Sequence, residues 1–251
     1  RAAAGVDYVL HQAAIPSVPR SVTDPITSNR ANVDATLNIL VAARDAGVKR
    51  LVYAGSSSAY GDTPTLPKRE DMPTKPLSPY ALQKLVGEQY MQMFTQLYGL
   101  ETVSIRYFNV FGPRQDPSSP YSGVISIFMT KALTAGVPVI YGDGRQSRDF
   151  IFVGDVVQAL IRAADSQGGT GKVFNVGTGR SVTIRALWDV VAALSGSSAK
   201  PVHEPPRPGD VPQSVSAIDA ARTDLGFVPE VGFEKGLELT IEWYRNAVMA
   251  S

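Results

Sequence analysis

The sequence predicts an α/β fold built on a doubly wound parallel sheet, with a smaller C-terminal α/β lobe. Three short, mostly apolar runs, 6–11, 49–55 and 101–107, have the composition of strands in a parallel sheet. Long helical patterns separate them at 24–46 and 78–98. The chain has 251 residues, 44% of them hydrophobic, which is enough for one large α/β domain or for a domain with a smaller lobe.

The composition excludes several classes of function. The 24 basic and 23 acidic residues give a net charge of +1, which provides no strong field for nucleic acid or an anionic membrane. The absence of cysteine excludes disulfides and thiolate catalysis, and two histidines, His11 and His203, disfavour a zinc cluster or a Ser-His-Asp hydrolase. No apolar run reaches about 18 residues. We therefore expect a soluble, cytoplasmic protein without a leader or membrane span.

The beginning of the chain predicts that an N-terminal segment is missing. The first residue is Arg1 rather than methionine, and the first strand follows almost at once, at 6–11. In a doubly wound sheet of order 3-2-1-4-5-6, this strand would be the fourth, and the absent segment would supply strands 1 to 3. We expect 6–11 to form an apolar edge of the remaining sheet, either open or covered by a neighbour.

The first strand is followed by a predicted loop and a long helix. The loop begins with His11-Gln12-Ala13-Ala14, and we interpret His11 as a hydrogen-bonded strand-end residue without an acid/base role. Asp24 is expected to cap the helix, with Pro25 at its first position, and Gly47 to end it. Its predicted buried stripe consists of Val33, Leu37, Leu40 and Val41.

Two motifs carry groups suited to catalysis. The second strand ends in Ser56-Ser57-Ser58, and ligands of open α/β sheets bind beyond the carboxyl ends of the strands. The next helix begins at Ser78-Pro79 and carries Tyr80 and Lys84 on one face, because they are four residues apart. A cation about 5 Å from a phenol favours the phenolate by about two pKa units, which would make Tyr80 a general base. Y-x-x-x-K alone is a weak signal, and a serine-rich turn can be merely solvated.

The rest of the chain alternates less regularly. We expect helices at 123–135, 154–164 and 233–248, strands at 137–141 and 172–176, and a turn at 142–144. The run Gly177-Thr178-Gly179-Arg180-Ser181-Val182 imitates a dinucleotide-binding fingerprint, but Val182 stands in place of the third glycine. We interpret it as a tight strand-to-helix turn. No other stretch has the pattern G-x-G-x-x-G.

The order of these motifs resembles that of the extended short-chain dehydrogenase/reductase family, and within it the nucleotide-sugar epimerases. The matching segments are H-Q-A-A, S-V-P-R-S, S-S-S-x-Y-G-D, L-P-K-x-E, P-L-S-P-Y-A, R-Y-F-N-V-F-G-x-R-Q-D-P, S-R-D-F and G-D-V. The resemblance is closest to bacterial UDP-N-acetylglucosamine 4-epimerases. It implies a Rossmann-like NAD-binding domain, 1–112 and 150–178, and a nucleotide-sugar-binding lobe, 113–149 and 179–251. It also implies a homodimer through the helices at 24–46 and 78–98.

The resemblance implies roles for residues at the matching positions. The catalytic trio would be Ser56, Tyr80 and Lys84, without a metal. The residues implied in NAD binding are Ala13, Ala14, Asn32, Tyr80, Lys84 and Tyr107. Those implied in binding the UDP-sugar are Ser17, Ser57, Ser58, Asn109, Val124, Tyr141, Arg148, Arg207, Asp210 and Ser214. Three of these have simpler alternatives: Asn109 could close a turn, Arg148 could form a surface ion pair, and Ser214 could end a loop.

The implied reaction inverts C4 of UDP-N-acetylglucosamine and UDP-N-acetylgalactosamine, and of the non-acetylated pair, by transient oxidation with NAD. Ser214 indicates room for an N-acetyl group, because a tyrosine at this position in related epimerases closes the pocket. Related dehydratases and decarboxylases need an acid beside the catalytic serine, whereas here the first acid after the serines is Asp62. A nucleotide-sugar-binding fragment without catalysis stays open. Because the phosphate-binding loop is missing, we expect this chain to bind NAD weakly or not at all.

Overall fold

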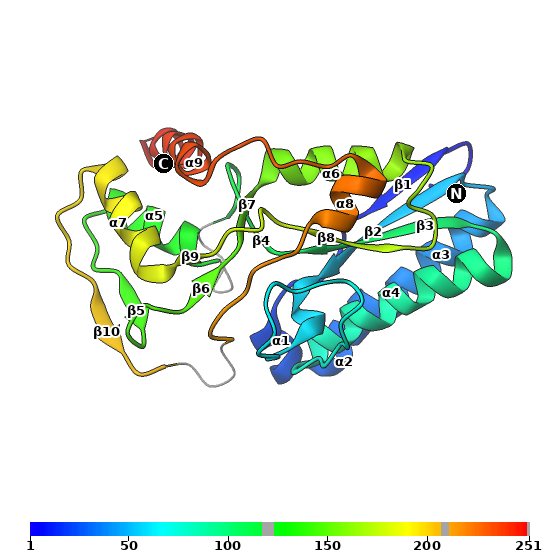
Figure 1. Ribbon diagram of the computed structural model, residues 1–251, viewed down its shortest axis with the longest axis horizontal. Coiled ribbons are helices and arrows are strands. Elements are labelled where there is room, and N and C mark those ends of the chain that lie inside the picture. The colour runs from blue at the N-terminus through cyan, green and yellow to red at the C-terminus, as the bar shows by residue number, and fades with distance from the viewer. Residues whose placement is uncertain (117–122, 207–210, 250–251) are drawn as a thin grey trace.

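The computed structural model describes residues 1–116, 123–206 and 211–249. Two parts lie side by side along its longest axis (Figure 1). The larger part contains a parallel sheet with helices on both faces. The smaller part contains α5 (Val124–Leu133), α7 (Ile184–Ser195) and α9 (Phe233–Met249) with short strands. The fold is the α/β type with a parallel sheet that the sequence predicts.

Four parallel strands form the sheet, in the order β1 (Tyr8–His11), β2 (Arg50–Ser56), β3 (Glu101–Tyr107) and β8 (Val173–Val176). Side chains alternate across a strand, so Leu51 and Val52 of β2 enter the cores on opposite faces. Within the described residues β1 is an edge strand, and Tyr8 and Leu10 are 47% and 45% exposed. The expected edge position of this strand is confirmed.

One face of the sheet is covered by α3 (Ala35–Asp45) and α4 (Pro79–Tyr98). The predicted caps are confirmed. The side chains of Asp24 and Ser78 each accept a hydrogen bond from a backbone N–H group in the turn that follows. Gly99 ends α4 in the left-handed conformation, which glycine adopts without strain.

The helix expected at 24–46 is interrupted. It consists of α2 (Pro25–Asn29), a π-helical turn η1 (Arg30–Asp34) and α3. A π turn spaces residues differently from an α-helix, so it shifts the apolar face of the helix that follows. Leu40 of the predicted stripe is fully buried, and Leu37 and Val41 are partly buried and pack against the same core. Val33, in the π turn, is partly buried and is not part of that core. The predicted stripe is therefore confirmed at three of its four positions.

A helix that the sequence analysis does not predict, α1 (Val18–Thr23), lies in the expected loop after β1. The Ser17 side chain caps it by accepting a hydrogen bond from Arg20 N, and Pro19 stands in its first turn. Its capping serine and its proline are visible in the sequence, but a helix of six residues is too short to show a periodic apolar stripe, so the segment is predicted as a loop.

The opposite face of the sheet is covered by α6 (Val153–Asp165) and α8 (Asp219–Leu225). Their apolar side chains pack in one core with Val103, Ile105 and Phe174 of the sheet. The range 179–251, which the sequence analysis assigns to the nucleotide-sugar-binding lobe, includes α8, yet α8 packs on β8 and α6. Part of this range therefore belongs to the larger part of the molecule, with the parallel sheet.

The smaller part has a core of its own, in which α5, α7 and α9 contribute Phe128, Trp188 and Leu237. Its strand pairs are β4 (Asn109–Phe111) with β7 (Phe150–Phe152), β5 (Val139–Tyr141) with β10 (Val202–Glu204), and β6 (Ser147–Arg148) with β9 (Val182–Thr183). Because β4 begins two residues after β3 ends, the chain passes directly from the sheet into this part.

The residues that the structure describes include no helix with the length and apolar character needed to cross a membrane. They also include no cluster of three or more His, Asp or Glu side chains that could hold a metal ion.

Candidate active site

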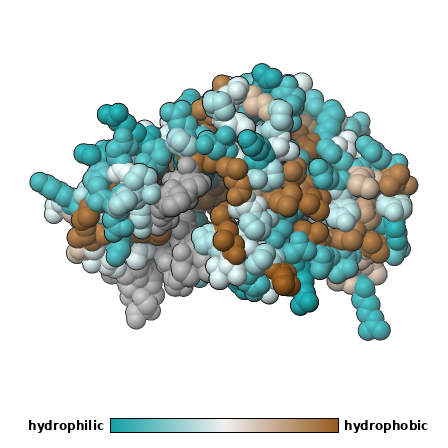
Figure 2. All heavy atoms as spheres, turned by 90° about the horizontal axis from the view of Figure 1, so that it is seen from below, coloured by the Kyte–Doolittle hydropathy of each residue, from teal (hydrophilic) through white to brown (hydrophobic). Residues whose placement is uncertain are grey.

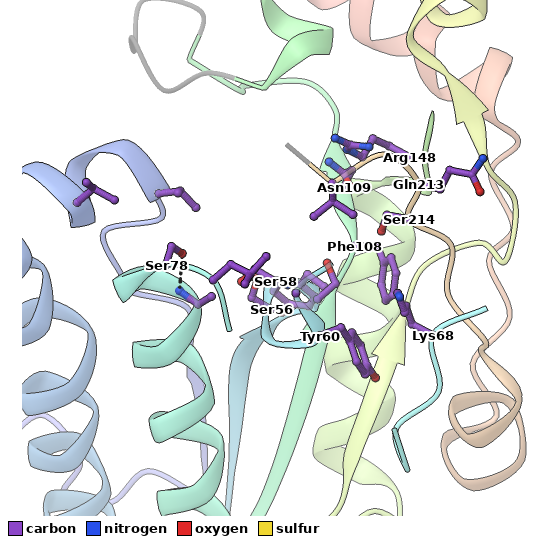
Figure 3. Close-up of a pocket in the computed structure, with 18 residues that line it drawn as sticks. Ser56, Ser58, Tyr60, Lys68, Ser78, Phe108, Asn109, Arg148, Gln213 and Ser214 are labelled. Atoms are coloured by element: carbon purple, nitrogen blue, oxygen red, sulfur yellow. Dashed lines mark hydrogen bonds between the residues drawn. The ribbon is translucent and has the colours of Figure 1, made fainter. Parts of the chain in front are cut away.

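A cavity of about 540 Å³ lies at the carboxyl ends of β2 and β3, beside the start of α4. Ligands of open α/β sheets bind at such ends. Figure 3 shows residues from both parts of the molecule around it, with Ser56 and Ser58 on one side and Asn109, Arg148 and Ser214 on another. The described residues that line this cavity include two cations, Lys68 and Arg148, and no Asp or Glu. The cavity therefore suits an anionic ligand.

The three serines are held by local hydrogen bonds in a short 3-10 helix, η2 (Ser57–Tyr60), directly after β2. Ser56 has an extended backbone and caps this helix. Its Oγ accepts a hydrogen bond from Ser58 N at 3.2 Å and lies 2.8 Å from Ser58 Oγ. All three serines line the cavity. The expected position of Ser56, Ser57 and Ser58 at the mouth of the site is thus found in the structure.

Tyr80 lies in the first turn of α4, next to Ser56. Its backbone N–H has no partner within the helix and donates to Ser21 Oγ of α1 at 3.0 Å. Burial raises the pKa of the Tyr80 phenol, and a side-chain hydrogen bond with Ser56 lowers it to a smaller extent. Ser56 and Tyr80 are therefore brought together as expected. Ser56 is one of the residues that line the cavity, whereas Tyr80 is not.

Lys84 is buried one helical turn beyond Tyr80. Its Nζ donates a 2.7 Å hydrogen bond to the carbonyl oxygen of Ala54 and lies 5.0 Å from the centre of the Tyr53 ring. Burial lowers the pKa of Lys84 to about 8. The expectation that Lys84 lowers the pKa of Tyr80 is wrong for this structure, in which the Tyr80 pKa is raised. The reason is that the ammonium group is directed at Ala54 and Tyr53, while burial dominates at the phenol.

The loop after β1 lies beside these residues. It carries Ala13 and Ala14, and the side-chain oxygen of Gln12 accepts a 2.8 Å hydrogen bond from the Tyr107 hydroxyl. His11 Nε2 lies 2.8 Å from Thr36 Oγ1, and burial, with a smaller effect of the Lys84 charge, lowers the pKa of His11 to about 4. The interpretation of His11 as a hydrogen-bonded strand-end residue is confirmed.

Two of the predicted binding residues make their contacts inside the protein. The Asn32 side chain is buried, accepts from Ile15 N at 2.7 Å, and donates to Ile15 O at 3.2 Å and to Gln83 Oε1 at 2.9 Å. Ser17 is buried at the start of α1. We interpret both as residues that hold the loop between β1 and α2 in place. Their predicted contacts with NAD and the UDP-sugar stay predictions.

A second cavity, of about 420 Å³, lies in the smaller part. Val124 of α5 and Tyr141 of β5 line it, together with apolar side chains such as Phe128. Asn109 and Arg148 line both cavities, so they lie between the two. Seven of the predicted substrate residues are therefore distributed over two adjoining cavities, with the arginine at the junction.

Ser214 lines the first cavity from the side opposite the serines (Figure 3). Its backbone N–H donates to Ser147 O at 3.1 Å, and Ser147 N donates to Pro212 O at 2.9 Å. The segment that carries Ser214 therefore runs along β6, next to Arg148. Arg207 and Asp210, which were also predicted to bind the UDP-sugar, lie outside the described residues.

The first cavity includes residues that the sequence analysis missed, among them Tyr60, Lys68 and Gln213. Lys68 is only 2% exposed, and its Nζ donates to the backbone and side-chain oxygens of Thr63. Burial lowers the pKa of Lys68. Lys68 is the lysine of L-P-K-x-E, one of the segments that resemble the family. The resemblance of that segment implies no role for the lysine, so the sequence alone does not place it in the cavity.

The sequence is similar to that of known proteins. Residues 1–177 match the sequence model of the NAD dependent epimerase/dehydratase family. A UDP-glucose 4-epimerase from Mycolicibacterium smegmatis is 42% identical over 241 residues, which cover 96% of this chain and 76% of that protein. The chain belongs to the NAD-dependent epimerase/dehydratase family.

Solved structures agree in fold. The UDP-N-acetylglucosamine 4-epimerase from Methanobrevibacter ruminantium, in complex with UDP-N-acetylmuramic acid, has a TM-score of 0.93 and 40% identity, covering 96% of this chain and 77% of that one. The UDP-glucose 4-epimerase from Thermus thermophilus, in complex with NAD, has a TM-score of 0.89 and 38% identity, covering 96% and 78%. This chain is thus similar to UDP-sugar 4-epimerases in both sequence and structure.

Proposed function

We propose that the protein is a UDP-sugar 4-epimerase that interconverts UDP-N-acetylglucosamine and UDP-N-acetylgalactosamine, with UDP-glucose and UDP-galactose as further substrates. The observation that carries the proposal is the pair of adjoining cavities that share Asn109 and Arg148. A nucleotide sugar consists of a nucleoside and a sugar joined by a diphosphate. Two cavities with a guanidinium group at their junction match these three parts.

Each part of the substrate has a place in this proposal. Arg148 binds the diphosphate, because a guanidinium group presents a planar set of donors to phosphate oxygens, and Asn109 contacts the same end. The nucleoside occupies the second cavity, against Val124 and Tyr141. The sugar occupies the first cavity, between the serines after β2 and Ser214, with Ser56 nearest to its reacting carbon.

The residues at the ends of β1, β2 and β3 fit the nicotinamide end of NAD. Ala13 and Ala14 are small and leave the backbone of the loop accessible, and Tyr80, Lys84 and Tyr107 bring hydroxyl and ammonium groups to the neighbouring strand ends. Bound NAD would supply the hydride acceptor and donor for C4 of the sugar. No G-x-G-x-x-G sequence for its pyrophosphate occurs in the 251 residues, so we propose that this chain binds NAD weakly.

Tyr80 is the proposed general base for the sugar 4-hydroxyl group and the acid that returns the proton. Ser56, which is hydrogen-bonded to the phenol, holds the same sugar oxygen. Because burial raises the pKa of Tyr80, the phenol is neutral at pH 7 before substrate binds. The Lys84 ammonium group is directed at the Ala54 carbonyl oxygen, so we propose that the phenolate forms only with NAD bound, when an oxidised nicotinamide would add a positive charge that lowers the Tyr80 pKa.

Other reactions of the family are less consistent with the residues. Relatives of this chain include a UDP-N-acetyl-alpha-D-glucosaminuronate decarboxylase at 34% identity and a dTDP-glucose 4,6-dehydratase at 32%. Those reactions were expected to need an acid next to the catalytic serine. Ser57 and Ser58 occupy that place, and the described residues that line the cavity include no acid. This observation favours epimerisation.

A homodimer is part of the proposal. Hydrophobic side chains are spread over the centre and right of the face in Figure 2, the side on which Figure 1 places α1, α2 and α4. Exposed apolar residues of α2 and α4 include Ile26 at 67%, Leu82 at 51%, Met93 at 47% and Leu97 at 65%. An apolar surface on α4 and on the helical segment 25–45 beside it suits pairing with a second copy into a four-helix bundle.

Turnover of UDP-N-acetylglucosamine by the purified chain with added NAD tests the reaction. Chromatography of the nucleotides should show UDP-N-acetylgalactosamine accumulating until the two reach equilibrium. A 4-keto-6-deoxy product would instead identify a dehydratase. Binding of UDP-N-acetylglucosamine without conversion, at saturating NAD, would support the nucleotide-sugar-binding alternative.

A further inference from the structure

Asp149 is a fully buried carboxylate between Arg148 and the core residue Phe150. Its Oδ1 accepts hydrogen bonds from Thr178 N at 2.8 Å and Thr178 Oγ1 at 2.7 Å. Its Oδ2 accepts from Gly179 N at 3.1 Å, Ser216 N at 3.0 Å and Ser216 Oγ at 2.5 Å. A buried carboxylate is tolerated when such donors replace its water, so the five bonds explain how Asp149 is accommodated.

These bonds connect Asp149 to two different segments. On one side is the turn Gly177-Thr178-Gly179, which imitates part of a dinucleotide fingerprint. A Cβ atom at Gly177 would lie 2.7 Å from Asp149 Oδ2, so the glycine is needed for the turn to approach the carboxylate. On the other side is Ser216, two residues beyond Ser214 in the wall of the first cavity.

The segment with Ser214 is held by three residues. Ser147 binds it before and at Ser214, through Pro212 O and Ser214 N. After Ser214, the backbone of Lys68 binds Val215 O and Ala217 N, and Asp149 binds Ser216 between them. Arg148 lies between Ser147 and Asp149 and points to the cavity (Figure 3). The place of Ser214 beside Arg148 in the cavity wall therefore depends in part on the bond between Asp149 and Ser216.

We propose that Asp149 is a positioning residue for substrate selection: through Ser216 it sets the place of Ser214, and with it the room for the substituent of the sugar. This inference rests on the proposed function, because it concerns the sugar end of a bound UDP-sugar. Asp149 does not line either cavity, and neither does Ser216. The effect is transmitted through the segment 212–216.

Two substitutions separate this role from general stabilisation. Ser216→Ala removes one hydroxyl donor to Asp149 on the cavity side, and Thr178→Val removes one on the turn side. In each case the backbone N–H of the same residue still binds the carboxylate. Each hydroxyl oxygen also accepts one backbone N–H of the turn, Ser216 Oγ from Gly179 and Thr178 Oγ1 from Arg180. The two variants are therefore matched in chemistry, and only Ser216→Ala loosens the segment that carries Ser214. Asp149→Asn weakens the hydrogen bonds to both segments, so its effect should be larger, but it is also more able to prevent folding.

Calorimetric titration with UDP and with UDP-N-acetylglucosamine provides the test. Ser216→Ala should weaken binding of UDP-N-acetylglucosamine by about tenfold, the size expected for a lost hydrogen bond to a charged group, and leave binding of UDP within about twofold. Thr178→Val should leave both affinities within about twofold. Thermal unfolding measured beside the titrations should show both variants folded at the working temperature.

The outcomes distinguish this inference from the proposed function. Equal losses for UDP and UDP-N-acetylglucosamine in Ser216→Ala, or the same loss in Thr178→Val, would overturn the positioning role while leaving the proposed function intact. A wild-type chain that binds neither ligand, or binds the two equally, would overturn the proposed substrate and the inference with it. If Asp149→Asn folds, it should show the same split as Ser216→Ala with a larger loss.

Discussion

Lys84 Nζ donates a 2.7 Å hydrogen bond to the carbonyl oxygen of Ala54, two residues before Ser56. This bond joins the first turns of α4 to the end of β2, the two elements that carry the predicted catalytic trio. It also places the ammonium group in a buried environment, where its pKa falls to about 8. The same lysine is therefore both an anchor between two elements and a charge whose state depends on pH.

The first prediction concerns stability at alkaline pH. The pKa of Lys84 is lower in the folded chain, at about 8, than its ordinary value of 10.5. Between these values the unfolded chain binds more protons, so the contribution of Lys84 makes the folded state more stable as pH rises from about 8 to about 10.5, by up to about 3 kcal/mol. Below pH 8 its contribution does not change with pH.

Urea unfolding of the wild-type chain and of Lys84→Met across pH 7 to 10.5 measures this contribution. Other groups, such as the tyrosines, titrate in both proteins and cancel in the difference. The wild-type chain should gain stability relative to Lys84→Met above pH 8. A constant or falling difference would show that the pKa of Lys84 is not lowered by folding.

Tyr80→Phe tests the proposed base. The substitution removes one phenolic oxygen and little packing, so it should lower epimerase turnover by at least about a hundredfold and leave the affinity for UDP-sugars within about twofold. Turnover is measured with saturating NAD and UDP-N-acetylglucosamine, and affinity by calorimetry. A variant that keeps a tenth of the activity would disprove the assignment of Tyr80 as the base.

Arg148→Ala tests the diphosphate contact. Loss of a charge-assisted hydrogen-bonding group should weaken binding of UDP by about 10- to 100-fold. Arg148→Lys should recover only part of this, because an ammonium group lacks the planar set of donors. Arg145→Ala is the control, since the Arg145 side chain is 89% exposed and does not line either cavity. Equal effects at the two positions would argue against the contact.

Ser214→Tyr tests the predicted room for the N-acetyl group. A tyrosine in the cavity wall should lower the affinity for UDP-N-acetylglucosamine more than that for UDP-glucose, because the larger side chain fills the space of the substituent. Ser214→Ala, which adds no bulk, should change the ratio of the two affinities by less than about twofold. If Ser214→Tyr leaves that ratio unchanged, Ser214 does not limit the size of the substrate.

Leu97→Glu tests the proposed dimer. Leu97 is 65% exposed on α4, so a charge there should separate the subunits without lowering the thermal stability of each one. Val137→Glu, at a position that is 51% exposed in the smaller part, is the matched control and should stay dimeric. Light scattering gives the mass of each variant. A monomeric wild-type chain, or a dimeric Leu97→Glu, would contradict the proposed interface.

Features with local causes could be predicted from the sequence. Ser78-Pro79 and Gly99 mark the two ends of α4, and both act through the backbone of their own turns. The same holds for Asp24, and for the strand that ends in Ser56. The π turn at Arg30–Asp34 has no such local signature, which is why the buried face of α3 was predicted only in part.

Features that depend on distant residues could not be predicted. The direction of Lys84 is set by the Ala54 carbonyl, 30 residues away in the sequence, and a helical spacing alone suggested that it faces Tyr80. Asp149 binds Thr178 and Ser216, which are 29 and 67 residues away. A pattern of neighbouring residue types contains no information about such contacts, so the role of Asp149 becomes visible only in the folded chain.

A crystal structure of the chain with UDP-N-acetylglucosamine tests the proposed function most directly. The diphosphate should bind Arg148 at the junction of the two cavities, with the sugar in the first. Oxygen O4 of the sugar should then lie within hydrogen-bond distance, about 2.6–3.2 Å, of Ser56 Oγ and the Tyr80 hydroxyl. A nucleotide bound elsewhere, or a sugar whose O4 points away from Ser56 and Tyr80, would contradict the assignment of this site to 4-epimerisation.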